Sequence, residues 1–188
     1  MTRGVGALLA LWLLPHAAIA QDGALGALQR NVELPAHRGL MAVVADPEMT
    51  LAPFVTDGCS GGLSATWEVA ADLFPDFEGA HKREPPWEAC CIAHDRLYHD
   101  ASGSTSPAAS FDARLAADEA LRVCVVANSQ ERIPDLADLY DVTAEQVRLA
   151  YGAIGDAMFN AVRFGGAPCS GLPWRWGYGY PGCLPAFN

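Results

Sequence analysis

The feature that most constrains this chain is a short run near its middle, in which cysteines and titratable residues recur at helical spacing. The run reads Cys90-Cys91-Ile92-Ala93-His94-Asp95-Arg96-Leu97-Tyr98. In a helix, positions i, i+3, i+4 and i+7 share one face, and here they hold Cys91, His94, Asp95 and Tyr98. Aliphatic residues occupy such a stripe in an ordinary packing helix. A lone His or Asp on a helix is usually solvated or structural, but this close grouping predicts a chemical site.

A glycine-rich segment around another cysteine precedes this run. It reads Asp57-Gly58-Cys59-Ser60-Gly61-Gly62. Glycine permits left-handed backbone and leaves carbonyl and amide groups open to a ligand at close range. Taken alone, such a segment is more often a plain loop than a binding site.

Together the two segments resemble secreted phospholipase A2, whose active-site helix has the pattern Cys-Cys-x-x-His-Asp-x-x-Tyr. The resemblance implies that His94 is the general base that activates water and that Tyr98 supports its hydrogen-bond network. It further implies that Asp95 binds calcium. The glycine-rich segment resembles the calcium-binding loop of the same superfamily, closest to its bacterial and divergent branches.

Two assignments of the remaining calcium ligands follow from that resemblance. In one, the ion takes backbone carbonyl groups of Gly58, Ser60 and Gly62. In the other, as in the bacterial branch, the carboxylate of Asp57 also binds the ion. Gly58 is common to both assignments.

The resemblance also implies three disulfides and a partner for His94. Family pairing implies Cys59–Cys91 and Cys90–Cys124, which leaves Cys169–Cys183. The family's orienting Asp lies six residues before a half-cystine, and here that residue is Asp118.

Helix geometry provides a check on the assignment of Asp118. If antiparallel helices are joined through Cys90 and Cys124, His94 lies about 6 Å beyond the disulfide along its own axis. Asp118 lies about 9 Å along the other axis in the same direction, within reach of the imidazole. Asp112 is the weaker candidate for the partner of His94. The alternative without a catalytic role is that Asp118 is an ordinary solvated residue.

The first twenty residues have the character of a secretory signal peptide. Arg3 precedes an apolar stretch, and Ala18-Ile19-Ala20 forms a small-x-small cleavage site before Gln21. An uncleaved N-terminal anchor is the alternative. We expect residues 21–188 to form one phospholipase A2-like domain without a transmembrane segment, located outside the cell or in the periplasm.

Export and charge exclude several kinds of protein. Six cysteines in an exported chain favour disulfides over a zinc site built from Cys59, Cys90, Cys91 and His94. The chain has a net charge of −10, and residues 1–20 contribute one Arg and no acidic residue. Such acidity argues against nucleic acid as a partner.

Sequence patterns predict a mainly α fold: two antiparallel disulfide-linked helices with additional helices and irregular loops. Before the central motif we expect a short helix over 24–32, a buried segment over 38–44, and an insertion over 63–88 with a helix from Ser64 to about Leu73. After the motif we expect a turn over 101–110 and a helix from Phe111 to about Val126, capped by Ser110. A polar connector over 127–141 then leads to a helix from Thr143 to Gly165-Gly166, with Gln146 in a capping box. The loop over 169–183 carries alternating aromatic residues, which suit either a membrane interface or packing on the body.

The resemblance covers residues 57–124 and implies a secreted, calcium-dependent hydrolase that cleaves the sn-2 ester of glycerophospholipids at a membrane surface or micelle. The alternative from another functional class is a catalytically inactive lipid- or receptor-binding protein of the same fold. Such proteins typically lack the His or the calcium-binding Asp, and this chain has both His94 and Asp95.

Overall fold

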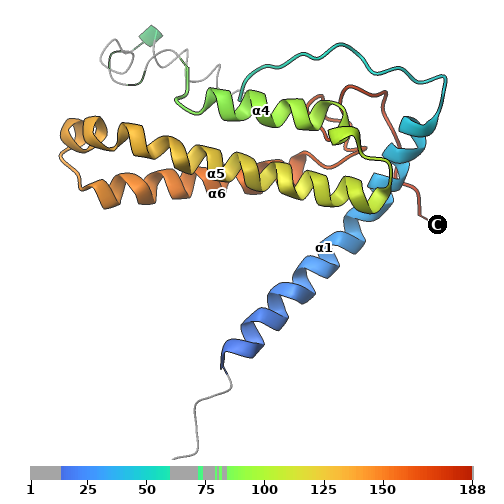
Figure 1. The fold of residues 1–188 in the computed structure, drawn as a ribbon, viewed down its shortest axis with the longest axis horizontal. Coiled ribbons are helices and arrows are strands. Elements are labelled where there is room, and N and C mark those ends of the chain that lie inside the picture. The colour runs from blue at the N-terminus through green and yellow to red at the C-terminus, as the bar shows by residue number, and fades with distance from the viewer. Residues whose placement is uncertain (1–13, 60–71, 74–78, 80, 82–83, 188) are drawn as a thin grey trace, which may run out of the picture. The chain divides into compact units, whose positions relative to one another are not determined.

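The computed structural model describes residues 14–59, 72–73, 79, 81 and 84–187, and within them the chain forms helices and loops but no β-strand. The elements are α1 (Leu14–Ala45), α4 (Glu88–His99), a 3₁₀ turn η1 (Ala101–Gly103), α5 (Pro107–Tyr140) and α6 (Ala144–Gly165) (Figure 1). The prediction of a mainly α protein is therefore confirmed for the described part of the chain.

The chain divides into two compact units, residues 1–33 and residues 34–188. Helix α1 runs through the boundary, so the two separate segments expected over 24–32 and 38–44 belong to one helix. In the second unit, Leu40 and Met41 of α1 are buried. Among the described residues, no helix combines the length and the apolar character needed to cross a membrane.

The second unit is built on α4, α5 and α6. Along α4 the contacts with α5 run from Cys90–Cys124 through His94–Asp118, so the two helices are antiparallel. Helices α5 and α6 are antiparallel as well (Figure 1). A Cβ atom on Gly155 of α6 would lie 3.2 Å from the carbonyl oxygen of Arg122, so glycine permits the close approach of these two helices.

Helix α5 differs from the sequence-based expectation at both ends. It begins at Pro107, and its N-cap is Ser106, whose hydroxyl accepts a hydrogen bond from the amide of Ala109 at 3.2 Å. The predicted cap, Ser110, lies inside the helix and is fully buried. Proline is favoured in the first helical turn, where its missing N–H has no partner to lose.

The segment predicted as a polar connector, 127–141, is helical to Tyr140 and contains Pro134. Ser129 and Leu136 continue the buried stripe that begins with Leu121 and Val125. Packing of this stripe outweighs the helix-breaking tendency of Pro134, because tertiary contacts supply most helical stability in proteins. The connector prediction was wrong for this reason.

Helix α6 has the ends that the sequence predicts. The Thr143 hydroxyl accepts a hydrogen bond from the Gln146 amide at 3.2 Å, and the Gln146 side chain accepts one from the Thr143 amide at 2.8 Å. The helix ends at Gly165, with Gly166 as its C-cap.

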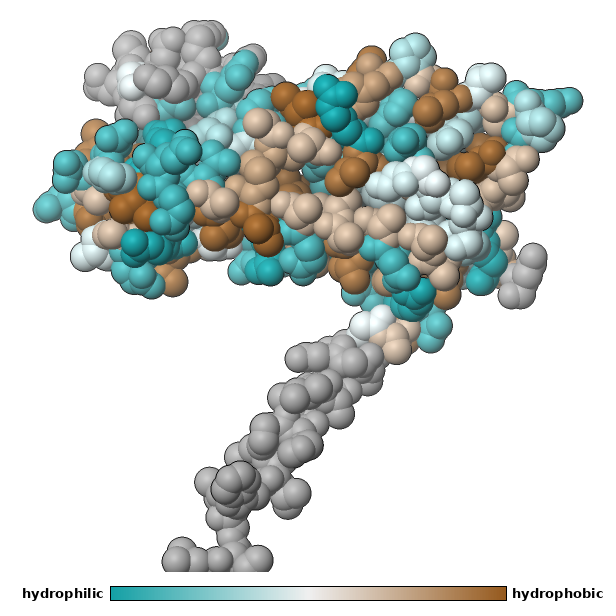
Figure 2. Space-filling model, viewed as in Figure 1, coloured by the Kyte–Doolittle hydropathy of each residue, from teal (hydrophilic) through white to brown (hydrophobic). Residues whose placement is uncertain are grey.

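Two clusters of buried side chains hold these helices together. One contains Trp87, Leu121, Val125, Leu136, Val147 and Tyr151 with two disulfides, and the other contains Leu40, Met41, Tyr98, Ala101, Ala117 and Trp176. Trp176 brings the C-terminal loop into the second cluster. On the face drawn in Figure 2, apolar side chains are interspersed with polar ones over α4 and α5.

Candidate active site

The candidate site begins on the inner face of α4, which carries the three titratable residues of the central motif. His94, Asp95 and Tyr98 are all buried, with exposed fractions of 6%, 7% and 1%. Disulfides join Cys91 of this helix to Cys59 and Cys90 to Cys124 of α5. These pairings, and Cys169–Cys183, are those that the resemblance implied.

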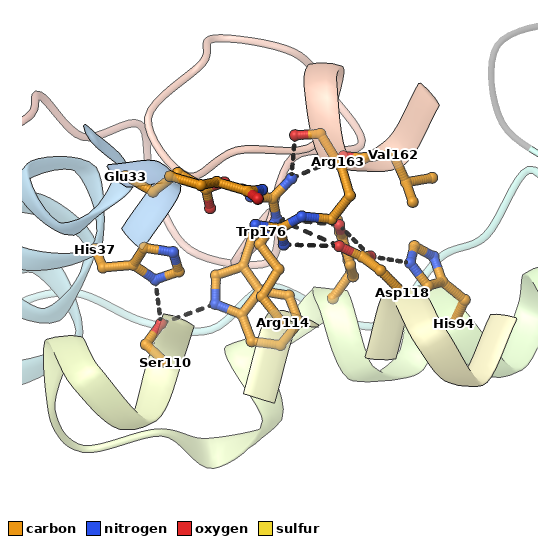
Figure 3. Close-up of polar contacts among 11 residues, drawn as sticks. Glu33, His37, His94, Ser110, Arg114, Asp118, Val162, Arg163 and Trp176 are labelled. Atoms are coloured by element: carbon orange, nitrogen blue, oxygen red, sulfur yellow. Dashed lines mark hydrogen bonds and ion pairs between the residues drawn. The ribbon is translucent and has the colours of Figure 1, made fainter. Parts of the chain in front are cut away.

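Asp118 of α5 supplies the carboxylate that faces His94. Its Oδ1 lies 2.9 Å from Nε2 of His94 and accepts a hydrogen bond from the Tyr98 hydroxyl at 2.7 Å (Figure 3). A carboxylate only accepts hydrogen bonds, so in the neutral imidazole Nε2 carries the proton and Nδ1 keeps its lone pair. The spacing argument placed these two side chains within reach, and they are in contact. Asp112 is exposed.

The second oxygen of Asp118 faces two arginines that the sequence analysis missed. Arg163 of α6 donates from Nη1 to Oδ2 at 2.9 Å, and Nε of Arg114 lies 3.9 Å from the same oxygen (Figure 3). Asp118 and Arg114 have no exposed surface, and Arg163 is 8% exposed. For Arg114, the sequence contains a signal of this contact, because Arg114 and Asp118 are spaced i, i+4 on one helix.

Asp95, beside His94, has very different neighbours. Its Oδ2 accepts a hydrogen bond from the Thr56 hydroxyl at 2.6 Å, and that hydroxyl accepts one from the Gly58 amide at 3.0 Å. Burial raises the pKa of Asp95 to about 6, and the negative charges of Asp57 and Glu88 act in the same direction. The bond from Thr56 and the nearby His94 oppose this shift only in part.

A pocket of about 360 Å³ opens beside His94 and Asp95. Its remaining lining is mostly apolar and comes from α5, α6 and the C-terminal loop: Leu121, Ala157, Met158, Ala161, Val162 and Trp174, with Gly58 and the Cys59–Cys91 disulfide. A second pocket of about 230 Å³ shares Asp95 and Trp174 with the first and is also lined by Thr56, Asp57 and Tyr178. Asp95 thus borders two cavities, and the second also contains the carboxylate of Asp57.

The described residues allow a test of which metal the site suits. Nowhere among them do three His, Cys, Asp or Glu side chains gather closely enough to hold an ion. All six cysteines form disulfides, which removes the thiolates that the zinc alternative needs. The groups that remain are oxygen donors, the type of ligand that a hard cation takes: the carboxylates of Asp95 and Asp57 and the backbone of Gly58, which lines the same pocket as Asp95.

Several predicted features fall on residues that the structure does not describe. Ser60 and Gly62 of the expected calcium loop lie outside the described residues. The helix expected from Ser64 is described only at 72–73, and the 63–88 insertion is described only in part.

In the aromatic loop after α6, Trp176 packs on the body, whereas Trp174, Tyr178 and Tyr180 are partly exposed. Trp176 is fully buried, makes an edge contact with Tyr98 at a centroid distance of 4.9 Å and donates a hydrogen bond to Ser110 at 2.9 Å (Figure 3). Tyr178 lies edge-on to His99. Trp174 is partly exposed and lines both pockets beside Asp95.

Comparisons with protein-family models, with curated proteins and with solved structures found no match to this chain. The functional interpretation therefore depends on the geometry of the site and on the sequence motifs.

Proposed function

We propose that this protein is a calcium-dependent phospholipase A2-like hydrolase that cleaves the sn-2 ester of glycerophospholipids. The observation that carries the proposal is the contact of His94 Nε2 with Asp118 Oδ1 at 2.9 Å, beside a largely apolar pocket that also contains Asp95. A base, an orienting acid, a second carboxylate and an apolar cavity are the groups that hydrolysis of a lipid ester requires.

In this proposal His94 is the general base. Its Nδ1 takes a proton from water while the water oxygen bonds to the carbonyl carbon of the ester. When the tetrahedral intermediate collapses, the bond to the glycerol oxygen breaks and the imidazolium returns the proton to that oxygen. The products are a fatty acid and a lysophospholipid.

Asp118 keeps His94 ready for this role. By accepting a hydrogen bond from Nε2–H, it fixes the tautomer that leaves Nδ1 basic, and its negative charge stabilises the imidazolium formed in the reaction. Tyr98 donates to the same carboxylate oxygen and so limits its rotation.

Asp95, Asp57 and the carbonyl group of Gly58 are the described groups that would hold calcium. When bound there, the ion supplies positive charge for the substrate phosphate and for the oxyanion that develops on the ester carbonyl. The raised pKa of Asp95 supports this assignment, because a buried carboxylate near Asp57 gains most from a cation.

The test is release of fatty acid from mixed phospholipid vesicles, measured with calcium and with excess chelator. The proposal predicts release only with calcium, only from the sn-2 position, and none from His94→Ala. Vesicle binding by the wild type without any release of fatty acid would contradict the proposal and assign the chain to the non-catalytic lipid-binding class.

A further inference from the structure

Two arginines from different helices converge on Asp118, although a single carboxylate needs only one counter-charge. We infer that Arg163 is a positioning residue that fixes the orientation of the Asp118 carboxylate and thereby the tautomer of His94. Its part in catalysis rests on the proposed function, whereas the positioning itself is measurable without a substrate.

The geometry separates the tasks of the two oxygens of Asp118. Oδ1 accepts from His94 and Tyr98, and Oδ2 accepts from Arg163 Nη1 at 2.9 Å. The two bonds at Oδ1 limit rotation about the Cβ–Cγ bond but leave some freedom, because that terminal torsion is broad. A charge-assisted bond to Oδ2 restricts this remaining freedom, since it is shorter and stronger than a bond between neutral groups.

Arg114 joins this arrangement to the end of α6. Its Nη2 donates to the carbonyl oxygens of Val162 at 2.7 Å and Arg163 at 2.9 Å, and its Nε donates to the Tyr98 hydroxyl at 3.2 Å. These carbonyl groups belong to the last turn of α6, where the helix dipole favours a cation. Arg114 therefore fixes the helical turn that carries Arg163. Nη1 of Arg163 lies at hydrogen-bond distance from Oδ2, whereas Nε of Arg114 lies 3.9 Å from that oxygen.

Gly166 shows how closely this turn approaches the site. A Cβ atom at this position would lie 2.9 Å from the Tyr98 hydroxyl and 2.7 Å from the Val162 carbonyl oxygen. The last turn of α6 thus lies directly against the phenol that shares Oδ1 with His94. It is Val162, not Arg163, that lines the pocket beside His94, so Arg163 acts through Asp118.

The experiment compares Arg163→Met and Arg163→Lys with Arg148→Met, a matched control on the exposed side of the same helix, where Arg148 pairs with Glu145 at 3.4 Å. We expect Arg163→Met to lower kcat by about 10–100-fold with little change in KM, as loss of an outer hydrogen-bond partner does elsewhere. Arg163→Lys should recover part of this loss, because the lysine keeps the charge but not the planar guanidinium. Arg148→Met should match the wild type.

The second readout is the tautomer of His94, taken from two-bond ¹H–¹⁵N spectra of the imidazole and assigned by comparison with His94→Ala. We expect protonated Nε2 alone in the wild type and in Arg148→Met, and a mixture of tautomers in Arg163→Met. If Arg163→Met does not fold, Arg163→Lys provides the test. We expect it to show both tautomers, with a smaller share protonated at Nδ1 than in Arg163→Met.

A wild-type tautomer in the folded Arg163 variants, or a kcat equal to that of Arg148→Met, would overturn the inference. If the wild type itself releases no fatty acid, the proposed function fails, and the tautomer measurement still decides whether Arg163 positions Asp118.

Discussion

Asp95 and Asp118 are two buried carboxylates on either side of His94, and the protein surrounds them in opposite ways. Asp118 faces Arg163 and Arg114, so its negative charge is neutralised by the fold itself. Asp95 accepts a hydrogen bond from neutral Thr56 and lies near the negative Asp57. The difference is that the fold itself places cations around Asp118, whereas Asp95 lies beside a neutral hydroxyl and a second carboxylate, as the proposed calcium site requires.

The largest expected difference between the two carboxylates concerns the cation. Asp95→Asn keeps the shape of the side chain but removes its charge, so we expect calcium binding to disappear and hydrolysis to fall on the order of 10³-fold. Isothermal titration calorimetry on the wild type should give a dissociation constant on the order of 10⁻⁴–10⁻³ M, because few carboxylates are available at the site. Undiminished calcium binding by Asp95→Asn would refute the metal assignment.

The second prediction applies the same change to the other carboxylate. Asp118→Asn removes the negative charge that Arg163 and Arg114 face inside the protein, so the free energy of unfolding should fall by about 3–5 kcal/mol. Urea unfolding of the calcium-free proteins measures this difference. Calcium binding should persist wherever this variant remains folded, because Asp118 is not a ligand.

Asp95→Asn is the matched control for that experiment. Because the folded protein raises the pKa of Asp95 to about 6, the proton is held more tightly in the folded chain than in the unfolded one. The ionised carboxylate is therefore unfavourable in the calcium-free fold. Its removal should leave the free energy of unfolding at neutral pH unchanged or raise it by about 1 kcal/mol, a value that includes a reduction for solvent screening. Equal destabilisation by the two substitutions would contradict the comparison.

The third prediction is a pH dependence with a defined sign. With a pKa of about 6, Asp95 is protonated in the calcium-free protein at lower pH, and calcium must displace that proton. Above that pH the affinity should be constant, and below it the affinity should fall up to about tenfold per pH unit. Titrations in two buffers of different ionisation enthalpy would detect the released proton. A constant affinity from acidic to neutral pH would show that Asp95 does not bind the ion.

The sequence predicts best those parts of the site that depend on local spacing. His94, Asp95 and Tyr98 share a face because a helix repeats every 3.6 residues, and a disulfide places Asp118 opposite them. The shared face follows from spacing alone, whereas the position of Asp118 follows only once the pairing of Cys90 with Cys124 is taken from the resemblance.

Other features depend on packing that no short stretch of sequence encodes. Ser106 and Ser110 are equally good caps, and the choice follows from the burial of Ser110 against Trp176. An arginine in a helix usually lies at the surface, so Arg163 could be recognised only after α6 was placed along α5. The same tertiary contacts carry α5 through Pro134.

The most direct test of the account is a double-mutant cycle of His94→Ala and Asp118→Asn on initial rates of fatty acid release. His94→Ala alone should remove nearly all hydrolysis, roughly 10⁴-fold or more, because no base remains to take the proton from water. Asp118→Asn alone should lower the rate less, since it orients the base. If the two residues act as one unit, the double variant should be no slower than His94→Ala. Losses that simply multiply would show that His94 and Asp118 do not share one proton-transfer network, and would contradict the central claim.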